Sequence, residues 1–140
     1  MDKRQTMIEL TLEEKMAMEN ETDFCNVIAI IRCDAFEQVE QCLRELGVPG
    51  ITVTCVKGYG EYTDFYCREW TTTHTRVEIF TATGQADAIA QAIMGVAHSG
   101  VPGDGIVAVQ PVSKIYRIRN RAELTPDEFI QSSQKTEGDK

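Results

Sequence analysis

The chain has 140 residues, of which 42% are hydrophobic, and its formal net charge is −8. This length and composition predict one globular domain with a modest core. The acidic balance argues against nucleic acid as the main partner, because a phosphate backbone is bound by Lys and Arg. No apolar run could span a bilayer, and residues 1–4 lead into acidic sequence rather than an apolar segment, so we expect no secretory signal and a cytoplasmic location.

Cysteine and histidine usage predicts neither a disulfide framework nor a metal site. The cysteines are odd in number and have no CxxC spacing, so we expect reduced, mostly buried thiols. The spacing of Cys67, Asp64, His74 and His98 matches no standard set of metal ligands. The residues considered are Cys25, Cys33, Cys42, Cys55, Cys67, Asp64, His74 and His98.

The first half of the chain predicts a leader followed by a strand, a helix and a second strand. Residues 1–24 form an acidic leader that we expect to be partly ordered, with a capping box at residues 11–14. The β-branched run at 26–32 predicts a strand. Apolar residues at helical spacing predict a helix over 35–46, begun by a box at Asp34 and ended by Gly47. Alternating Thr and Val predict a strand over 51–59.

The second half repeats this pattern after a loop. Residues 60–74 are polar and aromatic without a clear period, and predict a projecting mobile loop. A strand at 75–81, a helix at 85–97 and a strand at 106–109 follow. The order βαββαβ predicts an α+β, ferredoxin-like domain over residues 25–122, with both helices on one face of an antiparallel sheet. The other face would be apolar and uncovered, and other subunits could cover it. Residues 123–140 predict a short helix, begun by Thr125 and Pro126, and then a disordered tail.

A glycine-rich connection between the second helix and the last strand is a candidate anion site. Glycines at 100, 103 and 105 could turn their amides toward one point. Arg117 and Arg119 are two residues apart, which on an extended chain places both guanidinium groups on one face, and these groups suit phosphate oxygens. A tight turn with two solvated arginines is the alternative interpretation.

These motifs, together with the second predicted strand, resemble the PII signal-transduction family. The resemblance covers roughly residues 26–119 and includes the sequence Gly50-Ile51-Thr52-Val53-Thr54-Cys55-Val56-Lys57-Gly58-Tyr59-Gly60. It implies a homotrimer that holds adenine nucleotide in clefts between neighbouring subunits.

The resemblance also implies roles for individual residues. Gly103, Asp104 and Gly105 match the glycine–acid–glycine that wraps the phosphates, and the arginines match those that reach the phosphates from the adjacent subunit. Thr52 matches a contact to the adenine edge, Gly58 and Gly60 match the base of the mobile loop, and Glu78 and Phe80 match the ribose and base pocket. The implied nucleotide-binding set is Thr52, Gly58, Gly60, Glu78, Phe80, Gly103, Asp104, Gly105, Arg117 and Arg119. Taken singly, Glu78 could equally be a solvated strand carboxylate.

Several departures from the family pattern change the expected effectors. Ile106 stands where the family places a lysine, so we expect ADP or AMP to bind at least as well as ATP. His74 replaces a lysine and Glu61-Tyr62 replaces arginine–glutamine, so 2-oxoglutarate is not expected. His74 and Tyr62 are instead candidates for a second effector such as bicarbonate, since shortened-loop PII-like proteins associated with carbon-fixation genes resemble this design.

The loop sequence offers a candidate surface for a partner. It looks shorter than the family's loop and carries Phe65, Tyr66 and Trp70, which either contact a regulatory target or pack on the protein's own trimer.

The function implied is that of a non-catalytic nucleotide sensor that regulates a transporter or enzyme, in inorganic-carbon or nitrogen metabolism. A small acyl-phosphate or phosphate-ester hydrolase, or a weak ATPase, is the alternative, although no nucleophile–base pair is evident. An RNA-binding module is disfavoured by the charge and by the lack of paired aromatics on a central strand.

Overall fold

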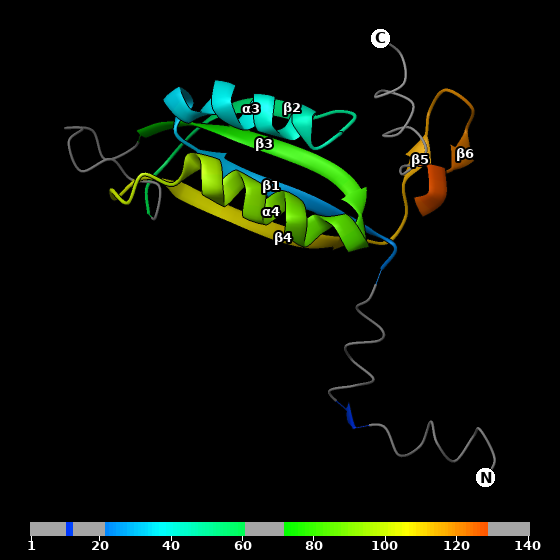
Figure 1. The fold of residues 1–140 in the computed structure, drawn as a ribbon. Helices are drawn as coiled ribbons and strands as arrows, with labels where there is room; N and C mark the ends of the chain where they lie inside the picture. The colour runs from blue at the N-terminus through cyan, green and yellow to red at the C-terminus, as the bar shows by residue number, and fades with distance from the viewer. Residues whose placement is uncertain (1–10, 13–21, 61–71, 129–140) are drawn as a thin grey trace.

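The computed structural model describes residues 11–12, 22–60 and 72–128. Its elements run β1 (Phe24–Ile31), η1 (Cys33–Ala35), α3 (Phe36–Glu45), β2 (Thr52–Gly58), β3 (Thr72–Ala82), α4 (Thr83–Ala97), β4 (Gly105–Val112), β5 (Tyr116–Arg117) and β6 (Ala122–Glu123). Within these residues one sheet has the order β2-β3-β1-β4, with every neighbouring pair antiparallel. Figure 1 shows α3 and α4 side by side on one face of this sheet. The predicted ferredoxin-like fold is therefore confirmed.

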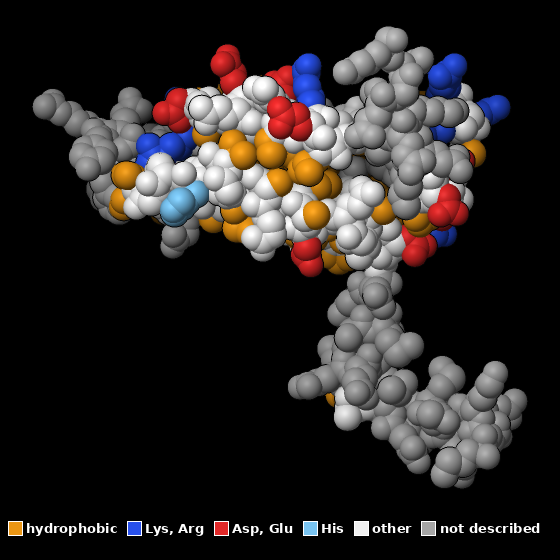
Figure 2. Space-filling model, viewed as in Figure 1, with side chains coloured by type: hydrophobic (Ala, Val, Ile, Leu, Met, Phe, Trp, Pro, Cys, Tyr) orange, Lys and Arg blue, Asp and Glu red, His pale blue; other side chains and the backbone are white. Residues whose placement is uncertain are grey.

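The core lies between this sheet and the two helices. Alternate residues of the central strands point toward the helices, so that Val27 and Val77 are fully buried in one core cluster with Val39 and Leu43 of α3. Burying one such side chain stabilises the fold by about 1.5–3 kcal/mol. Figure 2 shows the outer side of the helices, where apolar side chains follow the seam between α3 and α4 and Asp and Glu side chains stand outside it.

The ends of α3 show one confirmed and one wrong prediction. Gly47 has φ 83° directly after the helix, and its N–H donates to the carbonyl of Arg44 while that of Val48 donates to Leu43. This is the left-handed cap that glycine allows, so the predicted stop is confirmed. The predicted box at Asp34 is wrong, because α3 starts without a side-chain cap and the 3₁₀ turn η1 leads into it instead.

The second face of the sheet carries neither helix. Residues that pair across it are Asn26 with Phe80, Ile28 with Glu78, and Ile30 with Arg76. Phe80 is 44% exposed there. The face is therefore uncovered in one chain, as predicted, but it also holds an arginine and a glutamate that the prediction of an apolar face did not include.

The boundaries of the predicted loop and of the basic segment differ from expectation. β3 starts at Thr72, so residues 72–74 lie in a strand rather than in the loop. Residues 61–71 lie outside the described part of the chain, and with them the expected roles of Tyr62, Phe65, Tyr66, Cys67 and Trp70. Most of the leader and of the C-terminal tail also lie outside it.

Four cysteines fall within the described residues. Cys25 is buried and Cys42 partly so, whereas Cys33 and Cys55 are exposed. The expectation of mostly buried thiols is therefore wrong for this set.

The C-terminal helix start matches its expected chemistry. The N–H of Thr125 donates to Glu128 Oε2 at 3.1 Å, and the N–H of Glu128 donates back to the carbonyl of Thr125. This reciprocal bonding satisfies amides that the first helical turn leaves open. Among the described helices, none combines the length and the apolar character needed to cross a membrane.

Candidate functional site

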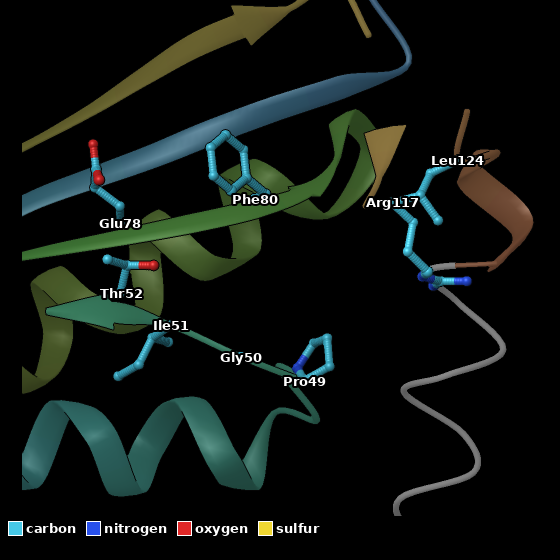
Figure 3. Close-up of a pocket in the computed structure, with 8 residues that line it drawn as sticks. All are labelled: Pro49, Gly50, Ile51, Thr52, Glu78, Phe80, Arg117 and Leu124. Atoms are coloured by element: carbon cyan, nitrogen blue, oxygen red, sulfur yellow. The ribbon is translucent and has the colours of Figure 1, made fainter. Parts of the chain in front are cut away.

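A cleft of about 450 Å³ collects part of the predicted nucleotide site. Figure 3 shows Glu78 and Phe80 on β3 beside Thr52 at the start of β2, with Arg117 of the C-terminal hairpin across from them. The remaining lining comes from Pro49, Gly50, Ile51 and Leu124. Four of the ten predicted residues thus share one cleft, while the others lie elsewhere.

Strand pairing explains why these side chains meet. Thr52 is the β-ladder partner of Glu78, so their side chains lie on the same face of neighbouring strands. Phe80 follows two residues later and therefore shares that face. The cleft thus has a hydroxyl on β2 and, beside it on β3, a carboxylate followed by an exposed aromatic ring. This set of groups suits a ligand with both polar and planar parts.

Arg117 and Arg119 do not form the predicted clamp within one chain. Arg117 pairs with Ala122 in the β5–β6 hairpin, whereas Arg119 lies in the turn between these strands. The turn is closed by a bond from the N–H of Arg121 to the carbonyl of Ile118 at 3.3 Å, and Arg121 has φ 52°. The prediction of two arginines on one face of an extended strand is therefore wrong.

The glycine-rich loop between α4 and β4 is organised around Asp104. Its carboxylate accepts the backbone N–H groups of Ser99 at 2.8 Å and Gly100 at 2.9 Å, and the hydroxyl of Ser99. Arg32 Nε lies 3.3 Å from the same carboxylate. The hydrogen bonds from Ser99, together with the weaker effects of Gly100 and Arg32, lower the pKa of Asp104 from 3.8 to about 2. Asp104 thus holds the loop's own amides, which leaves the amides of Ser99 and Gly100 unavailable to an outside anion.

Two further side chains brace this loop from neighbouring strands. Arg32, just beyond β1, donates through Nη2 to the carbonyl of Pro102 at 2.8 Å. His74 of β3 is 3% exposed, and its Nε2 lies 3.1 Å from the carbonyl oxygen of Gly103. The sequence did not indicate this role of Arg32, because a single arginine directly after an apolar strand is normally a solvent-exposed residue at the strand's end.

His74 has no ring nitrogen left for a small anion in this arrangement. Nδ1 lies 3.3 Å from Thr72 Oγ1, while Nε2 faces Gly103. With a proton on Nε2 the ring donates to the carbonyl of Gly103, and Nδ1 can then accept from the hydroxyl of Thr72. The ring therefore acts within the chain as a brace between the start of β3 and the loop.

Gly105 is required by close approach of two strands. A Cβ built at this position would stand 1.8 Å from the carbonyl oxygen of Ile30, and the backbone has φ 112°. Both the contact and the dihedral exclude any other residue. This glycine therefore sets the start of β4 against β1.

The loop and the cleft lie at opposite ends of the sheet. Figure 1 shows the α4–β4 connection at one end and the β5–β6 hairpin at the other. Gly103 touches His74, and Phe80 lies six residues further along β3, which amounts to about 20 Å at about 3.3 Å per residue. Gly58 likewise ends the strand that Thr52 begins. The ten predicted residues thus form two groups in one chain.

Within the described ranges, no three His, Cys, Asp or Glu side chains are grouped so that they could hold a metal ion. His98 is exposed and only its Nδ1, at 4.0 Å from Asp104, approaches a carboxylate.

Comparisons with known proteins identify the family. The family model for nitrogen regulatory protein P-II matches residues 24–122. The chain is 36% identical to nitrogen regulatory protein P-II of Rhizobium meliloti over 98 residues, which cover 65% of this chain and 88% of the relative. It is 35% identical to nitrogen regulatory protein GlnK2 of Haloferax mediterranei, covering 66% and 81%.

A solved structure agrees with the sequence matches. PII of Arabidopsis thaliana, crystallised with citrate, superposes with a TM-score of 0.64 at 28% identity and covers 74% of this chain and 88% of its own. The family is one of regulatory signal transducers rather than enzymes, which removes the hydrolase and ATPase alternatives. From residue 24 to residue 122, this chain belongs to the nitrogen regulatory protein P-II family.

Proposed function

We propose that this protein is an adenine-nucleotide sensor that assembles as a homotrimer and binds nucleotide between neighbouring copies. The observation that carries the proposal is the separation of the predicted site into two groups. The cleft that contains Thr52, Glu78, Phe80 and Arg117 is lined by none of the residues 103–105. The hollows beside that loop are in turn lined by none of Thr52, Glu78 and Phe80. A second copy could bring the loop of one chain to the cleft of the next.

The uncovered face of the sheet supports assembly. Phe80 and Ile106 are 44% and 41% exposed on it, which would leave apolar surface in water in a single chain. Asn26 is 9% exposed on the same face, and its Oδ1 is buried without a hydrogen-bond partner among the described residues. Buried polar atoms are normally bonded, so a donor from a neighbouring copy would complete this one.

The phosphate end of the site favours short phosphate chains. Ile106 stands directly after the glycine loop and supplies no charge, while Arg32 already contacts Asp104 and Pro102. A triphosphate has more charge to neutralise than a diphosphate or monophosphate. We therefore expect ADP or AMP to bind at least as tightly as ATP.

The output of the sensor would be the segment between β2 and β3, presented to a transporter or metabolic enzyme. Nucleotide can bias that segment only through its different affinity for the segment's conformations. Bicarbonate is the candidate second effector. Because both nitrogens of His74 are engaged, bicarbonate would have to displace the contact with Thr72 or with Gly103 in order to bind at this ring.

Calorimetric titration of AMP, ADP and ATP, with magnesium and with or without bicarbonate, tests the proposal. Arg117→Ala should weaken binding about tenfold to a hundredfold, which corresponds to losing one bond to a charged group of about 1.5–3 kcal/mol. Arg44→Ala, an exposed arginine on α3 outside the cleft, is the matched control and should bind normally. A protein that binds none of the adenylates, or that strongly prefers magnesium–ATP, contradicts the corresponding part of the proposal.

A further inference from the structure

The uncovered face of the sheet holds one ion pair beside the cleft. Arg76 Nη2 donates to Glu78 Oε1 at 2.8 Å, and the two side chains are two residues apart on β3. Their side chains are 40% and 27% exposed. The pair is therefore partly shielded, so the guanidinium constrains the carboxylate more than an exposed surface pair would.

The residues that pair with Arg76 and Glu78 on β1 and β2 carry no charge. Arg76 lies between Thr54 of β2 and Ile30 of β1, and Glu78 lies between Thr52 and Ile28. Arg76 bonds to Glu78 through Nη2. Its Nε is buried and has no hydrogen-bond partner among the described residues. Among the β1 and β2 residues that pair with Arg76 and Glu78 none is charged, so within these three strands Arg76 is the cation beside the carboxylate, while Arg117 of β5 lies across the cleft.

Glu78 lines the cleft and Arg76 does not. Because Oε1 accepts the hydrogen bond from Arg76 Nη2, Oε2 is the carboxylate oxygen without a hydrogen bond among the described residues. A carboxylate held at one oxygen keeps its rotamer, and its second oxygen can accept a hydrogen bond from a ligand hydroxyl. Figure 3 shows Glu78 and Phe80 projecting on the same side of β3, so a hydroxyl bonded to Glu78 would belong to a ligand that also meets the ring.

We infer that Arg76 is a positioning residue that fixes Glu78 so that its free oxygen reads a ribose hydroxyl of the bound nucleotide. This inference rests on the proposed nucleotide function and adds to it a sugar specificity with an assigned structural cause. Arg76 itself does not contact the nucleotide. Its removal should change the preference for ribose over deoxyribose and leave the preference among phosphate chain lengths unchanged.

Titration of ADP, 2′-deoxy-ADP, 3′-deoxy-ADP and AMP against the full chain tests this. The wild-type protein should bind ADP about tenfold tighter than one of the deoxy analogues, as expected for one hydrogen bond to a charged acceptor. Glu78→Gln should reduce that ratio to near one. Arg76→Gln should reduce it severalfold, Arg76→Lys should restore part of it, and neither should change the ADP to AMP ratio.

Two controls separate positioning from a general effect. In the Glu78→Gln background, Arg76→Gln should have no further effect on the ribose preference, because the group that it positions is already altered. Arg44→Gln breaks another Arg–Glu pair, 2.6 Å long on α3, and should leave the preference intact.

The outcomes distinguish this inference from the proposed function. If ADP binds and Arg76→Gln leaves the ribose preference unchanged, the inference is wrong and the nucleotide function stands. If wild-type protein binds ADP without any ribose preference, the inference is also wrong. If no adenylate binds, the proposed function itself fails.

Discussion

The Asp104 clamp gives the sharpest stability prediction for this fold. Asp104→Asn keeps the size of the side chain and removes the charge that accepts the amides of Ser99 and Gly100 and meets Arg32. The pKa falls from 3.8 to about 2 in the folded protein. At 1.36 kcal/mol per pH unit this difference is worth about 2.4 kcal/mol, and since the side chain is 23% exposed we expect a measured loss of about 1–2 kcal/mol at pH 7.

The pH dependence of that loss has a definite sign. The carboxyl has a lower pKa in the folded than in the unfolded chain, so it stabilises the fold fully above about pH 4. The stabilisation declines as the pH falls, reaching about half near pH 3 and little near pH 2. The difference between wild type and variant should therefore narrow by about half between pH 7 and pH 3.

Urea unfolding at a fixed protein concentration measures both quantities, because an assembly's stability depends on concentration. Asp87→Asn, an exposed carboxylate on α4, is the control and should change the free energy of unfolding by less than about 0.5 kcal/mol. Equal losses in the two variants at pH 7, or an Asp104→Asn loss that stays the same at pH 3, would refute the reasoning.

Two further substitutions test the loop's supports, each against a matched control. Gly105→Ala should prevent stable folding, because its Cβ would stand 1.8 Å from a backbone oxygen, whereas Gly50→Ala meets nothing within 4 Å and should fold; soluble yield and circular dichroism decide. His74→Ala should lower the free energy of unfolding by about 2–4 kcal/mol, since it leaves a cavity and removes the ring's contacts with Thr72 and Gly103, while His98→Ala, 75% exposed, should be nearly neutral in the same urea assay. A neutral His74→Ala would show that the brace does not support the fold.

Elements with local signals could be predicted from the sequence. The β-branched residues of β1 predicted a strand, and this strand lies in the middle of the sheet, between β3 and β4. Gly47 predicted the end of α3, where it adopts the left-handed conformation. The antiparallel sheet with both helices on one face followed from the order of the elements, because two strand–helix–strand halves of this length have few ways to pair.

The start of β3 could not be predicted, because its signal is tertiary. Residues 72–74 are polar, yet Thr72 and His74 are 6% and 3% exposed, and the histidine is satisfied by Gly103 from a distant part of the chain. A polar run of this kind reads locally as a loop.

The basic hairpin was missed for a related reason. Asn120 accepts the N–H of Ala122, and Arg121 takes the left-handed position that glycine usually fills, so no glycine marked the turn. The role of Asp104 was also hidden, since sequence spacing cannot tell a carboxylate that binds a ligand from one that binds its own loop.

A subunit-mixing titration tests the central claim most directly. Arg117→Ala damages the cleft half of the proposed site, and Gly103→Asp places a negative charge in the loop half. Each variant alone, shown to be folded by circular dichroism, should bind ADP poorly. If the site is built from two copies, co-assembly of a 1:1 mixture should restore wild-type affinity at about a quarter of the interfaces, since random assembly joins two intact halves that often. Binding that stays absent in the mixture, while both variants are shown to share assemblies, would contradict a site shared between chains.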